Sequence, residues 1–308
     1  MSRKRRQTVS LVLGSGGARG LAHIGVIYWL EEQGYRIESI SGASMGALVG
    51  GIHAAGKLDS YRDWVCALRR TDVVRFLDLA FQSQGLFKGD RIIDTLRRMV
   101  GEHRIEDLPI AYTAVATDID RRREVWISKG PLFDAIRASI AVPTVFTPHR
   151  YLDMSLLDGG LLNPVPIAPT FRDFTDLTIA VNLNAEPNRS PAPIEPESTS
   201  EGSAKEPVAH KSADSLRAHI QAFLDNIGDS FKPEEGDDGL GLFELVSSSF
   251  ETMQNAIAAV KLAAYAPDVL INVPRDACAA HEFHRADELI ELGRELAAEA
   301  MSGPDKHR

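Results

Sequence analysis

Cysteine is scarce in this chain of 308 residues, which contains only two. Cys66 and Cys278 are isolated and form no C-x-x-C motif, so the sequence predicts reduced core thiols in a cytoplasmic protein and no metal site. Long hydrophobic runs are missing as well, because no segment reaches the roughly 18 apolar residues of a membrane span. The apolar stretch 9–13 is shorter than the roughly 7 to 15 residues of a secretory signal. We therefore expect a protein that is soluble or peripheral to a membrane.

Positive charge is also in short supply, because 34 Lys and Arg residues face 43 Asp and Glu residues. The resulting net charge of -9 argues against nucleic-acid binding, which depends on a basic surface. The exception is the tail 1–7, in which Arg3, Lys4, Arg5 and Arg6 follow one another. We expect this tail to be flexible and solvated. The alternative is a weak attraction to anionic lipid, and so peripheral contact with a membrane surface.

Apolar residues are plentiful, at 44% of the chain, which is enough for one large core. The first 56 residues alternate between strand and helix patterns, with expected strands at 8–13 and 34–41 and expected helices at 21–33 and 45–55. Such alternation predicts parallel strands joined by helices. Both strand-to-helix turns then lie at the carboxyl ends of strands, where open α/β sheets build their sites.

The second of these turns contains Gly42-Ala43-Ser44-Met45-Gly46, a G-x-S-x-G motif. A side chain at the tip of a sharp strand-to-helix turn needs neighbours without a Cβ, which Gly42 and Gly46 provide. The free N–H groups and positive dipole end of the following helix favour an anionic intermediate beside Ser44. The motif therefore predicts a nucleophilic serine, although a glycine-rich helix start would give the same pattern.

The first turn is glycine-rich, with the sequence Gly14-Ser15-Gly16-Gly17-Ala18-Arg19-Gly20. A dinucleotide-binding loop needs glycines at its first, third and sixth positions, but the sixth residue here is Arg19, and no G-K-[ST] follows. We therefore expect no cofactor. The alternative use of the loop is an oxyanion hole, in which the N–H groups of Gly16, Gly17 and Ala18 point at a developing negative charge. Arg19 would add positive charge or a hydrogen bond that fixes the loop.

A carboxylate followed by two glycines, Asp158-Gly159-Gly160, comes much later in the chain. The glycines permit a turn that presents Asp158 inward while another backbone segment approaches closely. Asp-Gly is also a common hairpin turn, so this triplet alone does not separate the two interpretations.

The remaining segments predict helices at 59–70, 90–99, 132–140, 243–264 and 286–300, and strands at 111–117, 124–127, 177–183 and 269–273. Residues 71–88 have no clean periodicity and would form a lid, an acyl-chain wall or a surface helix pair. Residues 186–212 are rich in Pro, Ser and Glu and predict a disordered insertion. We expect the helical part 213–308 to pack on the same domain as 8–185. Its Ala-rich helices would form core or a dimer surface, which makes a homo-oligomer an open alternative.

Four motifs in order make the chain resemble the patatin-like phospholipase family, particularly its bacterial branch. They are the glycine-rich loop with Arg19, the Ser44 turn, the segment 137–143 and the Asp158-Gly159-Gly160 triplet. The resemblance covers about residues 8–185, with an echo at 283–286. It implies an α/β fold, a three-layer α/β/α sandwich around a mostly parallel sheet.

The resemblance also implies a Ser-Asp dyad that hydrolyses lipid esters without a cofactor. It assigns Ser44 as the nucleophile and Asp158 as the general base, with an oxyanion hole at Gly16, Gly17 and Ala18. Supporting positions are Gly14, Arg19, Gly20, Gly42, Gly46, Gly159 and Gly160. The activity would be that of a phospholipase A, a lysophospholipase or a carboxylesterase. Ser15 departs from the uninterrupted glycine run of many relatives.

Three alternatives stay open at the level of sequence. A lipid acyltransferase would use the same residues, and a non-catalytic lipid-binding or regulatory module would keep the fold alone. A Ser-Asp-His triad is also compatible with the order of the chain, since His281 and His284 follow Asp158. An ordinary aspartate, with a pKa of about 3.9, is a weak base for a serine hydroxyl, so the dyad requires burial of Asp158 or strong stabilisation of the oxyanion.

Overall fold

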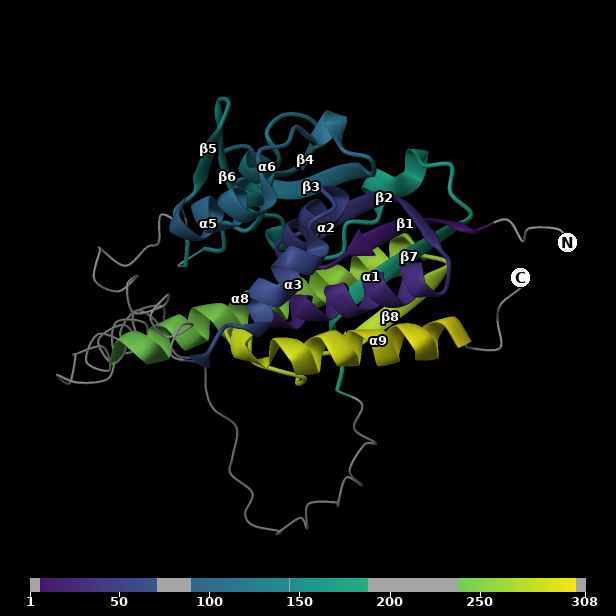
Figure 1. Ribbon diagram of the computed structural model, residues 1–308. Coiled ribbons are helices and arrows are strands. Elements are labelled where there is room, and N and C mark those ends of the chain that lie inside the picture. Colours follow the sequence, from purple (N-terminus) through teal and green to yellow (C-terminus); the bar gives the residue numbers. More distant parts are fainter. Residues whose placement is uncertain (1–5, 71–89, 144, 188–237, 303–308) are drawn as a thin grey trace, which may run out of the picture. The chain divides into compact units, whose positions relative to one another are not determined.

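The computed structural model describes residues 6–70, 90–143, 145–187 and 238–302 (Figure 1). The expected lid at 71–88, nearly all of the expected insertion at 186–212 and most of the basic tail lie outside these residues. The chain divides into two compact units, Met1–Asn188 with Ser249–Arg308, and Arg189–Ser248. Of the second unit, only the first turns of helix α8 are described. The following account concerns the first unit.

An eight-stranded sheet forms the centre of this unit (Figure 1). Five strands run parallel in the order β3, β2, β1, β7, β8, with bounds Ala111–Asp118, Arg36–Ala43, Thr8–Leu13, Leu177–Ala185 and Val269–Pro274. The antiparallel strands β4, β5 and β6 extend the β3 edge, with bounds Arg123–Ile127, His149–Tyr151 and Met154–Asp158. The predicted mostly parallel sheet is therefore confirmed.

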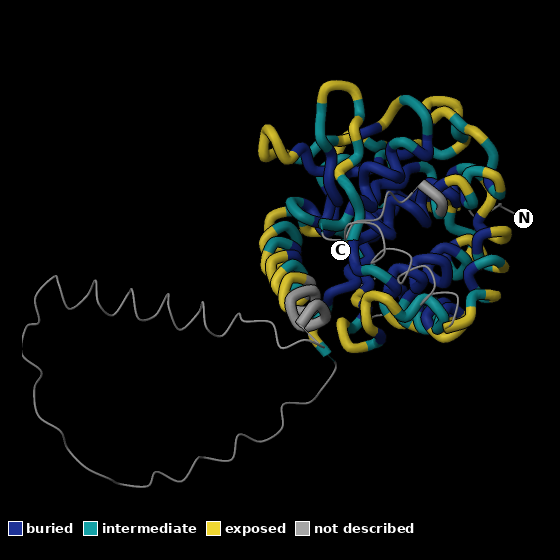
Figure 2. Tube along the Cα trace, turned by 90° about the vertical axis from the view of Figure 1, so that its left-hand side faces the viewer, coloured by how far each residue is buried: buried dark blue, intermediate teal, exposed yellow. Residues whose placement is uncertain are grey.

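Helices cover both faces of the sheet and complete three layers. On one face, a large core joins strand residues such as Leu11 and Ile40 to helices α1, α2, α3, α5, α6 and α9. Their bounds are Ala22–Glu32, Met45–Ala54, Leu58–Cys66, Asp90–Val100, Leu132–Ser139 and Ala286–Ser302. On the other face, Ala258 of α8 (Asp238–Ala264) packs with Val12 and Ala180. Figure 2 shows that buried residues fill the centre and exposed residues the rim. The predicted α/β/α sandwich is confirmed.

Short 3-10 helices connect these elements. They are η1 (Gly17–Leu21), η2 (Ile105–Asp107), η3 (Gly159–Leu161), η4 (Ala168–Arg172) and η5 (Phe283–Arg285). Among the described residues, no helix combines the length and the hydrophobicity needed to cross a bilayer.

Helix α9 lies against α1 (Figure 1). Each helix has a glycine at this contact. A Cβ on Gly25 would collide with the carbonyl oxygen of Ile290, and a Cβ on Gly293 would collide with that of Ala22. The two backbones therefore approach closely, because neither glycine has a side chain at the crossing. This contact fixes α9 on α1, the helix that joins β1 to β2.

The hairpin formed by β5 and β6 was not predicted. Its two-residue turn is Leu152-Asp153, and Leu152 has a φ of 52°. Leucine is rare in that left-handed region, where turns of this kind usually place Asn or Gly, so the sequence carries no hairpin signal there. The Asp158-Gly159 pair, which could have been a hairpin turn, instead marks the end of β6 and the start of η3.

Candidate active site

Ser44 stands at the turn between β2 and α2, as its motif predicts. Its φ of 55° and ψ of -122° are unfavourable for any residue with a Cβ, and it is 5% exposed. A Cβ on Gly42 would lie 2.5 Å from the carbonyl oxygen of Gly46, and a Cβ on Gly46 would overlap the backbone of Leu13. Both glycines are therefore required for the serine to be presented in this strained conformation.

Ser139 fixes this turn from the end of helix α6. The Ser44 N–H donates to Ser139 Oγ at 3.0 Å, and Ser139 Oγ donates to the Val115 carbonyl oxygen at 2.5 Å. Both serines are buried. Sequence reasoning did not assign this role to Ser139, although the residue lies within the 137–143 segment that carries the family resemblance.

Asp158 ends strand β6 and is completely buried. Its Oδ1 accepts a hydrogen bond from the Gly160 N–H at 2.7 Å, whereas Oδ2 has no hydrogen-bond partner among the described residues. Burial raises the pKa of Asp158 to about 7, and the nearby Ser44 hydroxyl and Gly160 N–H lower it in part. Among the described residues, no hydrogen bond of ordinary length joins the Ser44 hydroxyl to this carboxyl group, although the hydroxyl is near enough to affect its pKa. Such catalytic contacts are often long before substrate binds.

The backbone of Asp158 is held from three directions. Its N–H donates to the Ala141 carbonyl oxygen at 2.9 Å, and its own carbonyl accepts from Thr117 Oγ1 at 2.9 Å. Asp158 also pairs with Ala116 of β3. A Cβ on Gly159 would collide with the Val115 carbonyl oxygen, so the glycine allows β3 to pass this closely. The carboxylate therefore has a fixed position at the edge of the parallel strands.

The glycine-rich loop supplies two free backbone donors. Gly14 N–H donates to the Val181 carbonyl oxygen at 3.0 Å, and Ser15 N–H to that of Pro164 at 2.8 Å. In the described part of the chain, the N–H groups of Gly16 and Gly17 donate to no carbonyl oxygen. These two amides can serve as oxyanion donors.

Ala18 does not fit the predicted oxyanion hole. Its N–H donates to the carbonyl oxygen of Ala280 at 2.9 Å. A donor that is already paired cannot also stabilise a negative charge without giving up its partner. The sequence could not show this, because Ala280 comes from a segment more than 260 residues away along the chain.

Arg19 is buried and holds the loop through its side chain. The side chain is 3% exposed and donates to four acceptors at 3.1 to 3.3 Å: Asn184 Oδ1, Glu251 Oε1 and the carbonyl oxygens of Arg275 and Cys278. Of the two roles expected for Arg19, the structure supports the loop-fixing hydrogen bonds.

His23, a fully buried residue of α1, also supports this loop. Burial lowers the pKa of His23 to about 4, so the ring is neutral at pH 7. Its Nε2 lies 2.9 Å from the carbonyl oxygen of Gly14, which can only accept, so Nε2 carries the proton and donates. Nothing in the local sequence pattern distinguishes this histidine from an ordinary core residue.

The histidines of the alternative triad make no hydrogen bond to Asp158 among the described residues. His284 lies in η5 and His281 just before it. The groups that alter the pKa of Asp158 are Ser44 and Gly160, and no hydrogen bond joins either histidine side chain to that carboxylate in the described residues.

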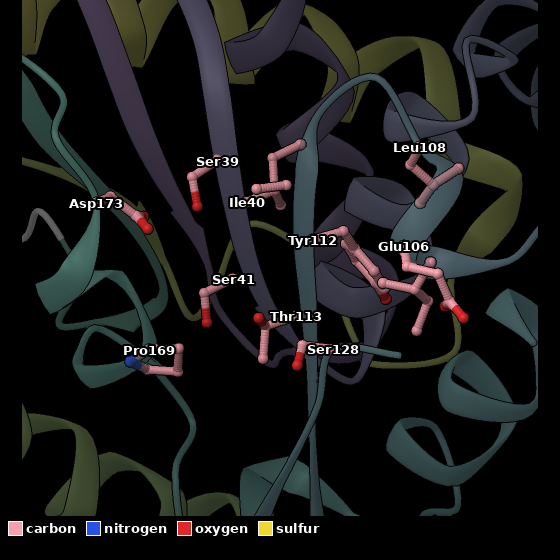
Figure 3. A pocket seen from close by; sticks show the side chains of 12 residues that line it. Ser39, Ile40, Ser41, Glu106, Leu108, Tyr112, Thr113, Ser128, Pro169 and Asp173 are labelled. Atoms are coloured by element: carbon pink, nitrogen blue, oxygen red, sulfur yellow. The ribbon is translucent and has the colours of Figure 1, made fainter. Parts of the chain in front are cut away.

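A polar cavity of about 360 Å³ lies on the same sheet but apart from this site (Figure 3). Its lining includes Ser39 and Ser41 of β2, Thr113 of β3, and Ser128 and Asp173. Figure 3 shows Ser41, Thr113 and Ser128 around one space. Neither Ser44 nor Asp158 lines the cavity, so we do not assign it to the dyad.

Comparison with known proteins supports the family suggested by these motifs. The family model described as patatin-like phospholipase matches residues 11–171, which is more than half of the chain. The chain belongs to the patatin-like phospholipase family. It is 42% identical to an uncharacterized NTE family protein of Mycobacterium tuberculosis, over 95% of this chain and 91% of that protein. The resemblance predicted from the sequence is thus confirmed.

More distant members of the family include proteins with named activities. Lysophospholipase nte1 of Emericella nidulans is 32% identical over 60% of this chain but only 12% of its own length, and lysophospholipase NTE1 of Kluyveromyces lactis is 32% identical over 60% and 13%. VipD from Legionella pneumophila matches with a TM-score of 0.41 and 13% identity, over 95% of this chain and 68% of that chain, which is too distant to carry an assignment. Membership of this family supports lipid ester hydrolase activity.

Proposed function

We propose that this patatin-like phospholipase is a serine acyl hydrolase of lipid esters that uses a Ser44–Asp158 dyad. The observation that carries the proposal is the combination of a strained serine with a completely buried carboxylate whose Oδ2 has no hydrogen bond among the described residues. Two free N–H groups, on Gly16 and Gly17, occur in the loop that precedes α1. These are the nucleophile, base and oxyanion donors that acyl transfer requires.

In the proposed first step, Asp158 takes the proton of the Ser44 hydroxyl while Ser44 Oγ attacks the ester carbonyl carbon. The negative charge that develops on the carbonyl oxygen is stabilised by the N–H groups of Gly16 and Gly17, and one such donor typically contributes about 100- to 1000-fold in turnover. The ester C–O bond then breaks, and the alcohol leaves with the proton held by Asp158. An acyl group remains on Ser44.

In the second step, a water molecule attacks the acyl-enzyme and gives its proton to Asp158. The carboxylic acid leaves, Ser44 regains a proton and the site returns to its starting state. A buried aspartate with a pKa of about 7 is better suited to these transfers at neutral pH than one with an ordinary pKa. The raised pKa is thus chemically consistent with the role of a general base.

The test is covalent labelling with a fluorophosphonate, together with hydrolysis of p-nitrophenyl esters, phospholipids and lysophospholipids. We expect Ser44→Ala to abolish labelling and hydrolysis, and Asp158→Asn to reduce both at least 1000-fold. Ser41→Ala is the matched control, because Ser41 lies on β2, the strand that leads to Ser44, but lines the separate cavity. Labelling that survives Ser44→Ala would reject Ser44 as the nucleophile. A wild-type protein that never labels would reject the proposal in favour of a non-catalytic module.

A further inference from the structure

Helix α8 contacts the glycine-rich loop through two side chains one turn apart. Gln254 is 3% exposed, and its Nε2 donates to Ser15 Oγ at 3.0 Å. Glu251, three residues earlier on the same face of the helix, pairs with Arg19 at 3.2 Å. Ser15 and Arg19 flank Gly16 and Gly17. The helix therefore holds the loop on both sides of its free N–H groups.

The same glutamine reaches the turn that carries Asp158. A Cβ on Gly160 would lie 2.5 Å from Ser15 Oγ and 2.9 Å from Asp158 Oδ1, and it would collide with Gln254 Nε2. All three polar atoms therefore surround one backbone position. The Gly160 N–H, in turn, donates to Asp158 Oδ1. The loop, the Asp158 turn and α8 thus meet at Gln254.

We propose that Gln254 is a positioning residue for the Ser44–Asp158 chemistry. By holding Ser15 against the Asp158–Gly160 turn, it fixes the two free amides of Gly16 and Gly17 relative to the carboxylate. This inference rests on the proposed function. It also gives a role to Ser15. Its buried hydroxyl would be costly to leave unpaired, and a glycine at that position could not accept the hydrogen bond from Gln254.

A purely structural role for Gln254 would have different consequences. If the residue only packed α8 against the loop, Gln254→Met would lower stability but leave the kcat of the protein that remains folded unchanged. The charged and titratable groups on the neighbouring elements are otherwise engaged: Glu251 with Arg19, Asp118 with Arg121, Arg137 with Thr147, and His23, held neutral by burial, with Gly14. A shift of the Asp158 midpoint in Gln254→Glu would therefore report how close the side chain at position 254 lies to that carboxyl group.

The test compares Gln254→Glu and Gln254→Met with the control Met253→Gln, which changes an exposed neighbour on the same helix. The Asp158 carboxyl carbon is titrated by NMR, with Asp158→Asn to assign its signal, and kcat/KM is measured against pH with a p-nitrophenyl ester. We expect Gln254→Glu to raise the Asp158 midpoint by about one pH unit, because a second carboxyl group nearby disfavours the charged form. We expect Gln254→Met to lower kcat about tenfold or more with little change in KM, because oxyanion donors act in the transition state.

The outcomes separate the two proposals. An active Gln254→Glu variant with an unmoved Asp158 midpoint would overturn the positioning role alone. A Gln254→Met variant that loses activity only in proportion to its loss of folded protein, measured by circular dichroism, would do the same. A wild-type protein that neither labels with fluorophosphonate nor hydrolyses any ester would reject the proposed function, and the positioning role with it.

Discussion

Asp158 is a carboxyl group that is buried without a cationic partner among the described residues. Since burial raises its pKa to about 7, only part of the protein holds the base in its charged form at neutral pH. We predict that kcat/KM falls about tenfold for each pH unit below 7 and levels off above it. A pH profile with a p-nitrophenyl ester checks this, and a limb near pH 4 would show that Asp158 ionises like an exposed aspartate.

The same burial makes ionised Asp158 a destabilising group. The folded-state pKa of about 7 exceeds the unfolded value of about 3.9, so the protein binds this proton more tightly when folded. The stability gained from binding this proton is complete below about pH 4 and is lost as the pH rises through 7. We predict that Asp158→Asn raises the free energy of unfolding at pH 8 by about 1 to 3 kcal/mol and has little effect at pH 4.

Denaturant melts of both proteins at the two pH values measure this difference. Asp153→Asn serves as the control, since Asp153 is exposed in the β5–β6 turn and should give no such gain. A loss of stability in Asp158→Asn at pH 8 would contradict the argument. A gain of stability in Asp158→Asn at pH 8 would show that the wild-type aspartate destabilises the fold, as residues required for function often do.

Individual site residues were predictable from the sequence where a local sequence pattern indicated them. Ser44 and Asp158 each have glycines within two residues, which predict a turn or a close backbone approach, and the structure places both at strand ends. Ser139, His23 and Gln254 were not predictable, because each acts on a residue from another part of the chain. The catalytic and oxyanion roles themselves stay predictions until the labelling experiment is done.

At the scale of elements, the crossing of α1 and α9 gives a test in which helix propensity and backbone packing predict stability changes of opposite sign. Replacing Gly293 by alanine favours the helix by roughly 0.5 to 1 kcal/mol on intrinsic propensity alone. The added Cβ, however, would meet the backbone of Ala22, which has no flexible side chain to move aside. We predict that Gly293→Ala lowers the free energy of unfolding by about 2 kcal/mol or more.

The control for that prediction is Glu295→Ala on the exposed face of α9, which should change stability by less than about 0.5 kcal/mol. Thermal and urea melts distinguish the two outcomes. A Gly293→Ala variant as stable as the wild type would mean that α1 and α9 can separate without penalty.

The elements that the sequence predicted well are those with a strong hydrophobic periodicity or a clear terminating residue. The expected strand at 34–41 continues to Ala43 as β2, because its parallel pairing with β3 extends to Val115. The expected helix at 59–70 ends earlier, at Cys66, in α3. The short β5–β6 hairpin was missed because three residues and an atypical turn give no periodic signal.

For the whole molecule, the family and the layered α/β/α fold followed from four motifs and from the alternation of strands and helices. What the sequence did not show is how the last helix contributes. In the first unit, α9 packs on α1 and joins the main hydrophobic core through Leu289 and Ala297. Such long-range contacts leave no trace in local periodicity.

We predict that a chain ending at residue 285 fails to fold, because it uncovers the apolar surface that α9 buries on α1. A chain ending at residue 302 is the control, since it retains every described element. Circular dichroism and size-exclusion chromatography separate the two. A shortened chain with a cooperative melt and full fluorophosphonate labelling would show that α9 is dispensable.

One peptide group of β3 contacts the neighbours of both Ser44 and Asp158. The Val115 carbonyl oxygen accepts from Ser139, which holds the Ser44 turn, and Gly159 passes against the same oxygen beside Asp158. The next residue, Ala116, pairs with Asp158 itself. A displacement of this part of β3 would therefore disturb the Ser44 turn and the Asp158 turn together. The spacing of the two proposed reacting groups depends on one short stretch of a single strand.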